Sequence, residues 1–449
     1  MFSNFIGWFK PTFGLLLAGG FLATATFAAD TNQVSITDTP TNVPSATDST
    51  MTNLAGIVPD SESGEVMRKF ESWNSYDGKW MSAQLGWIVI GDAAAASQNQ
   101  ASKSQVGNIG DDAEFRAFRL YTRGQIKFAN PWTYFIAGEY KGFAQDPGAP
   151  NWQLTDVALT IPLNDTFGKL TVGKTKETMG MEVLMAGTAT PMMERAAVLS
   201  AFVPTRDVGI KLANSFLDQR ATWSVGVFNN WFATDNSFNA NGSTISARLS
   251  GLPLYNDNGR ELIHLGASFR YVQAENDSVR YRSRPEVNTA PYFVDTGSFV
   301  SDHSDILGLE AGWVEGPFTL YGEYLFNWVD SSSTGNPFFS GYYVTASYLL
   351  TGEVRPYNRS SGLFGKVVPL HPFNFHGEWG AWEIAARFSE VDLNDAEVQG
   401  GQFERTSLGV NWHLTEQWRW SFNYGYTDFN RNGTTGHAQF FQTRVQWEF

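Results

Sequence analysis

The chain has 449 residues, a formal net charge of −14, an isoelectric point of about 4.9 and no cysteine. The acidic balance argues against a nucleic-acid-binding protein, which needs a basic surface, and the lack of cysteine excludes a disulfide framework and a thiolate metal site. Aromatic residues make up 15% of the chain while the mean hydropathy is −0.25. This combination does not indicate helical membrane spans; it is typical of strands with one face toward lipid and one toward water.

Residues 1–29 are interpreted as a secretory signal peptide. Lys10 supplies the positive charge, FGLLLAGGFLATATF is the apolar core, and Ala28-Ala29 precede Asp30 as small residues at a cleavage site. The apolar run is short and interrupted by Gly and Thr, which argues against a transmembrane anchor. We therefore expect a secreted protein.

Residues 30–75 are predicted to be a disordered periplasmic leader. They are rich in Thr, Ser, Asn, Asp and Pro and carry too few large apolar residues to offset the entropy of ordering. The end of this segment, 65–75, could form a short helix. From Trp80 onward the pattern changes to a period of two, so we expect a β-barrel over residues 76–449.

Alternation is clearest near the C-terminus. Between positions 418 and 426 every second residue is aromatic, and small or polar residues lie between them. A strand directs alternate side chains to opposite faces, so one face is a wall of rings that a membrane barrel presents to lipid. The final segment, 436–449, repeats the pattern and ends on Phe449. A terminal aromatic residue there resembles the signal that the outer-membrane assembly machinery recognises.

About sixteen such segments follow one another, which predicts an all-β, 16-stranded antiparallel transmembrane barrel. Closure leaves no unpaired strand edge in lipid, and an even strand count leaves both termini on the periplasmic side. The expected strands are 80–91, 114–128, 131–143, 152–163, 167–175, 206–214, 220–230, 243–251, 260–275, 303–315, 316–329, 339–351, 375–391, 402–414, 417–429 and 436–449. Short connections such as Asn130-Pro131 should alternate with long loops, namely 92–113, 276–302, 330–338 and 392–401.

Residues 176–205 break the alternation. They are rich in Met, Ala and other small residues and lie between two expected strands. So apolar a segment would be unusual as an exposed loop. We therefore expect it to fold into the barrel and narrow the pore as a constriction loop.

Four pieces of the sequence resemble the phosphate-selective porin O and P family. They are FRAFRLYTRGQIKF (115–128), KLTVGKTKE (169–177), MERAAVLSAFVPTRDVGIKL (193–212) and WSVGVFNN (223–230), of which the third is the most specific. The resemblance covers the first half of the barrel. It implies a homotrimeric 16-stranded porin in the outer membrane of a Gram-negative-type bacterium, with an inward-folded third loop and basic residues lining the pore.

Strand parity predicts which charged side chains face the lumen. Phe118, Leu120, Ile126 and Phe128 would face lipid, so the neighbouring basic residues of that segment would face inward. The candidate pore-lining and anion-binding residues found in this way, or by lying at or near the constriction loop, are Arg119, Arg123, Lys127, Lys174, Lys176, Arg195, Arg206, Lys211, Arg248, Arg270, Arg387, Arg405, Arg419 and Arg444. The acidic residues expected inside are Glu139, Asp156, Asp207, Glu310, Glu323, Glu383 and Glu448.

A charged ring in a narrow channel selects which ion enters, because the low-dielectric walls focus its field. The planar fork of arginine suits phosphate and carboxylate. We therefore hypothesise passive diffusion of small hydrophilic solutes with a preference for anions such as phosphate, without a cofactor. The same arginines could instead brace the wall in Arg–Glu networks, which would leave a non-selective diffusion porin.

Two other classes of protein remain open. A barrel enzyme would need a Ser/His or Asp/His constellation at one rim, but the six His are scattered and no GxSxG or phosphate-binding loop is evident. An adhesive barrel would use loops such as 276–302 to bind a partner, and its lumen would be sealed. The close pair His371 and His376 flanks Pro372, which does not indicate a metal site, and the acidic pair Asp111-Asp112 could contact Ca²⁺ in a loop.

Overall fold

The computed structural model describes residues 73–140, 152–229, 241–431 and 433–449. The expected signal peptide and most of the expected leader lie outside these ranges. The last leader residues, 73–75, are described: β1 (Ser75–Asp77) pairs with the beginning of β2, so this stretch is ordered against the barrel.

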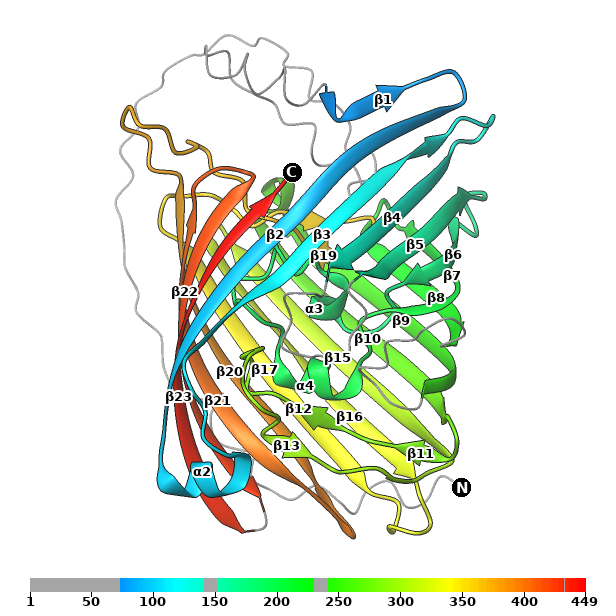
Figure 1. Ribbon diagram of the computed structural model, residues 1–449. Helices are drawn as coiled ribbons and strands as arrows, with labels where there is room; N and C mark the ends of the chain where they lie inside the picture. Colours follow the sequence, from blue (N-terminus) through cyan, green and yellow to red (C-terminus); the bar gives the residue numbers. More distant parts are fainter. Residues whose placement is uncertain (1–72, 141–151, 230–240, 432) are drawn as a thin grey trace, which may run out of the picture. The chain divides into compact units, whose positions relative to one another are not determined.

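Sixteen long strands of the described residues form one closed antiparallel sheet, as predicted (Figure 1). Each strand pairs with its neighbour in the chain, and the pairing of the first with the last, from Ile88 opposite Glu448 to Gln98 opposite Ala438, closes the ring. The strands are β2 (Met81–Gln98), β3 (Asp112–Ile126), β4 (Trp132–Tyr140), β5 (Trp152–Pro162), β6 (Lys169–Thr175), β7 (Asp207–Phe216), β8 (Ala221–Asn229), β9 (Asn241–Asn256), β10 (Glu261–Ala274), β15 (His303–Glu315), β16 (Phe318–Asp330), β17 (Phe338–Leu349), β20 (Ala381–Asp395), β21 (Val398–His413), β22 (Trp418–Arg431) and β23 (Thr434–Glu448).

Aromatic side chains gather on the outer face near both ends of the barrel. At the end that carries the C-terminus, Trp418 stacks on Trp447 with ring centroids 5.2 Å apart, and Trp382 stacks on Trp412 at 5.1 Å. At the opposite end Trp328 lies 5.5 Å from Phe338. Two such belts flanking an apolar band are typical of a barrel that crosses a membrane. We call the end with the C-terminus the turn end and the other end the loop end.

Two of the expected long loops are wrong in extent. The expected loop 92–113 is shorter, because β2 continues to Gln98 and β3 begins at Asp112. Helix α2 (Gln100–Val106) lies between them, with Asn99 accepting the backbone N–H of Ser102 as its N-cap. The expected loop 392–401 is a tight hairpin in which only residues 396–397 separate β20 from β21. The ends of these strands alternate small and polar residues rather than aromatic ones, so the sequence pattern did not reveal how far the strands extend.

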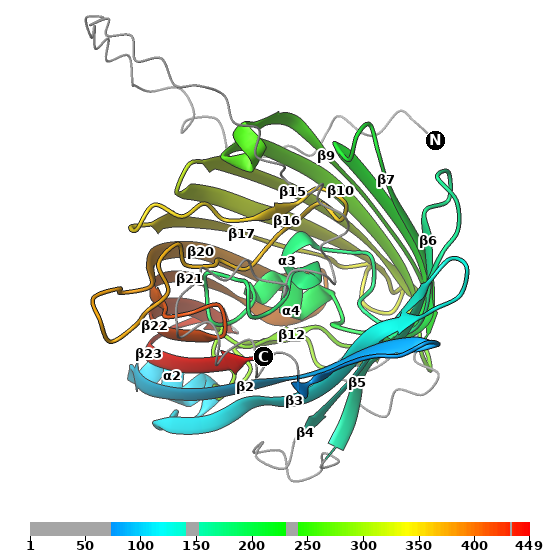
Figure 2. The same cartoon turned by 90° about the horizontal axis from the view of Figure 1, so that it is seen from above.

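Three segments fill much of the barrel interior. The inner loop (residues 176–206) carries α3 (Met181–Leu184) and α4 (Ala197–Phe202), and both helices lie inside the ring in Figure 2. The vestibule loop (275–302) enters from the loop end with β11 (Ser278–Val279), β12 (Arg282–Ser283), β13 (Val294–Asp295) and β14 (Phe299–Val300).

A short 3₁₀ turn, η1 (Asp257–Gly259), joins β9 to β10. None of the helices in the described part of the chain is long and apolar enough to span a membrane.

The third segment, residues 350–380, was not expected and is here called the strap. It leaves β17 at the turn end, where only short turns were expected, and carries β18 (Tyr357–Asn358) and β19 (Leu363–Phe364). The expected strand 375–391 therefore begins only at Ala381. Gly362 has φ +67°, and a Cβ there would lie 2.3 Å from Oγ of Ser250 on β9, so the strap approaches the opposite wall at a position that only glycine fits.

Candidate functional site: a basic path along one wall of the lumen

The lumen has one covered wall and one open wall. On β9, β10 and β15 to β23 the inward side chains alternate as buried positions, with Arg387 2% and Asn411 1% exposed, because the inner loop and the strap pack over many of them. On β3 the inward side chains keep more access to solvent, 29% for Arg116, 21% for Arg119 and 34% for Lys127. We call this accessible row on β3 the candidate solute path.

The predicted lumen arginines of the covered wall attach the inner loop. Arg270 bonds Glu177 through two nitrogens, at 2.8 and 3.1 Å. Arg387 donates to Glu182 at 2.5 Å, and the same carboxylate accepts the N–H of Ala196 at 2.9 Å. These contacts satisfy buried carboxylates and backbone groups that would otherwise be left without partners.

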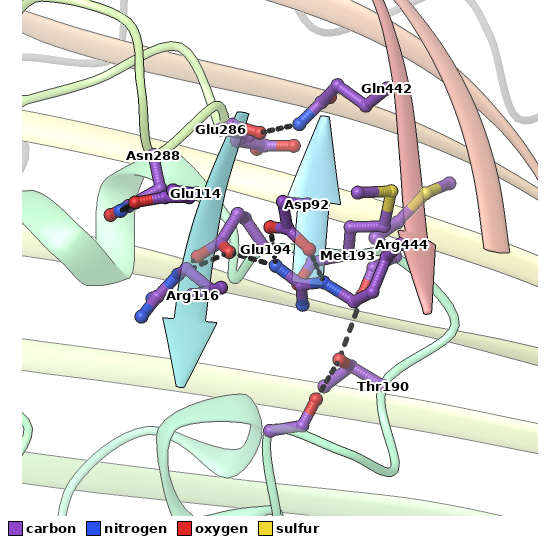
Figure 3. A network of polar contacts seen from close by, with 12 residues as sticks. Asp92, Glu114, Arg116, Thr190, Met193, Glu194, Glu286, Asn288, Gln442 and Arg444 are labelled. Atoms are coloured by element: carbon purple, nitrogen blue, oxygen red, sulfur yellow. Dashed lines mark hydrogen bonds and ion pairs between the residues drawn. The ribbon is translucent and has the colours of Figure 1, made fainter. Parts of the chain in front are cut away.

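Arg444 connects the inner loop to two strands. Its Nη2 donates to Asp92 on β2 and to Glu194 of the loop, both at 2.6 Å, and Figure 3 shows the guanidinium between the two carboxylates. Glu194 also accepts Nε of Arg116 at 2.8 Å. Burial opposes ionisation of Glu194, but Arg116 and Arg444 outweigh it and lower its pKa to about 2. The carboxylate is therefore charged at any physiological pH.

Three further arginines predicted to face the lumen do so without being free for a solute. Arg248 bonds Glu310 and donates at 2.7 Å to the carbonyl of Gly362 in the strap. Arg405 donates to hydroxyl groups on its own and the next strand, and Arg419 donates to the carbonyl of Thr190 at 2.9 Å. All three are 4% exposed or less. Strand parity therefore predicted the correct face of the wall for these three arginines. Because they are buried, their contacts stabilise the fold and are out of reach of a solute.

The open wall is built around β3. Arg119 pairs with Glu139 of β4, Arg123 donates to Gln84 of β2 at 2.8 Å, and Lys127 pairs with Asp77 at the turn end. Arg116, which parity would have directed outward, joins the row because a β-bulge between Ile90 and Gly91 of β2 leaves it as the extra residue. Four basic side chains therefore follow one strand along the barrel.

The inner loop adds a second basic surface opposite this row. Arg206 donates to Asp156 at 2.8 Å, and Lys211 donates to the carbonyl of Lys176 at 3.1 Å. Nζ of Lys176 donates to the carbonyl of Met185 at 2.7 Å, and Arg195 donates to the same carbonyl at 3.2 Å. Burial, and then Arg195 and Arg206, lower the pKa of Lys176 well below its usual value. Burial, and then Arg206, lower the pKa of Arg195 to about 10.

Lys174 differs from the other predicted site residues. The pairing register sets it opposite Val157 on β5 and Val208 on β7, and Val157 is exposed on the outer face. Lys174 therefore lies at the loop end on the outer side of the wall, away from the solute path. Gly173, which precedes Lys174, has φ +127°, a backbone conformation that strand parity read from the sequence does not take into account.

At the loop end the path begins in a cavity of about 260 Å³ between β3, the inner loop and the vestibule loop. Its lining carries five arginines against two glutamates, namely Arg116, Arg195, Arg280, Arg282 and Arg284 against Glu194 and Glu286. The sequence analysis missed the three from the vestibule loop, because a loop without a period gives no parity signal.

Tyr292 organises the vestibule arginines. The guanidinium carbons of Arg282 and Arg284 lie 4.1 and 4.8 Å from the centroid of its ring, a cation–π arrangement. The nitrogens can still donate, as Nη1 of Arg284 does to the carbonyl of Asn288 at 2.5 Å. Among the described residues neither arginine forms an ion pair with a carboxylate, whereas Arg280 pairs with Asp295 at 2.5 Å. Burial opposes ionisation of Asp295, but the hydrogen bond from Arg280 outweighs it and lowers the pKa of Asp295.

This arrangement can attract and pass anions. The guanidinium groups present forked donors that match phosphate and carboxylate oxygens, and the low-dielectric walls concentrate their field along the path. A solute that moves from the vestibule to Arg123 and Lys127 would meet basic side chains in succession.

The profile of the family described as "Phosphate-selective porin O and P" matches residues 93–449. The chain belongs to this family. Membership places it among the β-barrels of the outer membrane, in which the short turns face the periplasm and the long loops face outward.

Three known proteins illustrate the relationship. An uncharacterized protein of Caulobacter vibrioides is 29% identical over 306 residues, which is 63% of this chain and 60% of the relative. Porin O of Pseudomonas aeruginosa is 25% identical over 221 residues, 42% of this chain and 49% of the relative. The matches thus span only about half to three fifths of these relatives. The anion-selective porin from Comamonas acidovorans shares the fold, with a TM-score of 0.52 and 14% identity over 82% of this chain and all of that one.

Proposed function

We propose that this porin passes small hydrophilic solutes by passive diffusion and prefers anions, with phosphate and other small oxyanions as the favoured class. The observation that carries the proposal is the vestibule cavity, where five arginines face two glutamates. Its volume of about 260 Å³ suits a small ion rather than a large ligand.

Ion pairs cancel part of the charge of these arginines, because Arg116 pairs with Glu194 and Arg280 pairs with Asp295. Glu194 is held by Arg116 and Arg444, and Glu286 accepts the N–H of Ala197 at 3.1 Å and lies 3.6 Å from Arg387. Arg195, Arg282 and Arg284 line the cavity and form no ion pair with a carboxylate among the described residues, although Nη1 of Arg284 donates to the carbonyl of Asn288 at 2.5 Å. The description of the family as phosphate-selective, and the name of the anion-selective porin that shares the fold, agree with this class of solute.

The test is a planar-bilayer measurement on the refolded protein and two charge-matched double variants. Arg282→Gln with Arg284→Gln removes two charges from the vestibule. Arg220→Gln with Arg260→Gln removes two charges from exposed turns at the other end, where Arg260 is 55% exposed. We expect the vestibule variant to lose anion selectivity and phosphate block of the chloride current, and the control to keep both. Equal behaviour of the two variants would contradict the proposal.

A non-selective diffusion porin is the second candidate. It is favoured by the six covered arginines, which brace loops and leave the selectivity to fewer residues than parity suggested. In that case phosphate would not block the chloride current of the wild-type protein. A channel rather than an enzyme is supported by the family and by the two His–Glu pairs of the covered wall: His264 and His413 have side chains 0% and 4% exposed, out of reach of a solute.

We also propose that the protein is a homotrimer and that Phe449 is read by the outer-membrane assembly machinery. An apolar hollow of about 910 Å³ on the outer face, lined by Ala93, Ala95, Phe422 and Phe441 among others, is a candidate subunit contact. Phe449 stacks on Trp87 with centroids 4.7 Å apart. Chemical cross-linking of the purified protein would test the trimer, and assembly of a Phe449→Ala variant would test the signal.

A further inference from the structure

The strap returns to β20 by a route outside the barrel. Residues 370–380 extend beyond the ring of strands, beside β21 (Figure 2). Phe373 contacts the outer-face Trp412 with ring centroids 5.5 Å apart, and Nε1 of Trp412 donates to the carbonyl of Trp379 at 2.7 Å. This outer segment, here called the anchor loop, therefore lies against the lipid-facing side of the wall at the turn end.

The anchor loop is a closed and internally bonded structure. The N–H of Gly380 donates to the carbonyl of His371 at 3.1 Å, which joins its two ends. The side chain of Asn374 accepts the N–H groups of His376 and Glu378 at 2.9 and 3.2 Å, as in an Asx turn. The N–H of Phe373 donates to the carbonyl of Leu414 at 2.6 Å, which fixes the loop to the β21–β22 turn.

This fixed loop displays its largest apolar side chains. Phe375 is 93% exposed, Trp379 is 66% exposed and Leu370 is 63% exposed. Transfer of such side chains from water to an apolar phase is favourable. A connection between two strands does not require large apolar side chains to be held out in water. We therefore infer that a partner covers this surface.

The position of the loop identifies that occupant. It continues the aromatic belt of the turn end, in which Trp382 stacks on Trp412 and Trp418 stacks on Trp447. Between 368 and 380 the only residue charged at neutral pH is Glu378, which lies 3.7 Å from His371. Aromatic rings beside a few polar groups are the composition that favours the headgroup boundary of a bilayer.

We propose that the anchor loop is an interfacial membrane anchor that inserts Phe375 and Trp379 into the phospholipid of the periplasmic leaflet. It would hold the outer end of the strap in lipid while the inner part stays in the lumen. The partner is a phospholipid surface, and this role is separate from the solute path on the opposite wall.

The absence of cysteine makes the test direct. Phe375→Cys is labelled with a polarity-sensitive fluorophore and reconstituted into phosphatidylethanolamine–phosphatidylglycerol vesicles. Asp165→Cys, on the exposed β5–β6 turn at the same end, is the matched control, and Trp379→Cys repeats the measurement from the same surface. Quenching is compared between a lipid-borne nitroxide and a water-soluble iodide.

We expect a blue-shifted emission at position 375, quenched several times more strongly by the lipid nitroxide than by iodide, and the reverse order at 165. Stronger quenching by iodide at both positions would overturn the proposal. Protection from both quenchers, together with disulfide formation between unlabelled copies, would assign the surface to a second copy of the chain and would also overturn it.

Discussion

The ion pair between Arg387 and Glu182 should be a main attachment of the inner loop, and Arg387→Met tests this. Glu182 is 0% exposed, and its carboxylate accepts from Arg387 at 2.5 Å, from the hydroxyl of Tyr321 at 2.8 Å and from the N–H of Ala196 at 2.9 Å. Removing the arginine leaves a buried carboxylate without its cation, which typically costs about 3–5 kcal/mol. The variant should unfold in urea with that loss of stability.

A matched pair on the surface sets the scale. Arg260 and Asp257 have side chains 55% and 70% exposed, so Arg260→Met should cost less than about 1 kcal/mol. The double variant Arg387→Met with Glu182→Gln should recover part of the loss, because the uncompensated charge is gone. Unfolding is followed by intrinsic fluorescence in vesicles, and loosening of the loop by added noise in single-channel current. A loss for Arg387→Met no larger than for Arg260→Met would refute this reasoning.

Three further predictions concern the path and the strap. Arg123→Gln removes a cation that bonds only the neutral Gln84 among the described residues, so it should reduce anion selectivity in a bilayer and change urea stability by no more than about 1 kcal/mol. Gly362→Val should displace the strap, because a Cβ would lie 2.3 Å from Oγ of Ser250 and φ is +67°, and faster proteolysis of the strap in detergent measures this. Anion selectivity should decline as the pH rises through about 10, because burial, and then Arg206, bring the pKa of Arg195 to about 10, while burial, and then Arg195 and Arg206, lower the pKa of Lys176 well below its usual value. A reversal potential that is flat over this range would contradict that assignment.

The barrel itself could be predicted because its cause is local. Alternating rings on segments such as 418–426 force one face toward lipid, and this signal survives without any knowledge of tertiary contacts. The position of the inner loop could be predicted for a related reason, since the apolar run at 176–205 lacks the alternation and has to be buried somewhere. The same rule failed for the strap, which mixes polar and apolar residues without a period and gave no signal that it enters the lumen.

The candidate site was predictable only in part. Parity gives the face of a side chain but not what covers it, so Arg387 and Arg123 look equivalent in the sequence, although one anchors a loop and the other faces the path. A bulge cannot be read from the chain, and for that reason Arg116 was missed. Lys174 was counted as pore-lining because it lies next to the constriction loop, whereas the pairing register places it on the outer side of the wall. Arg282 and Arg284 were missed because their position depends on a loop that folds back over the lumen.

The central claim is that the path along β3 favours anions. The zero-current reversal potential of the wild-type protein in a planar bilayer, under a potassium chloride gradient, tests it most directly. A potential of the sign set by chloride, which falls toward zero in Arg282→Gln with Arg284→Gln, is the predicted result. A potential of the sign set by potassium in the wild-type protein would contradict the account.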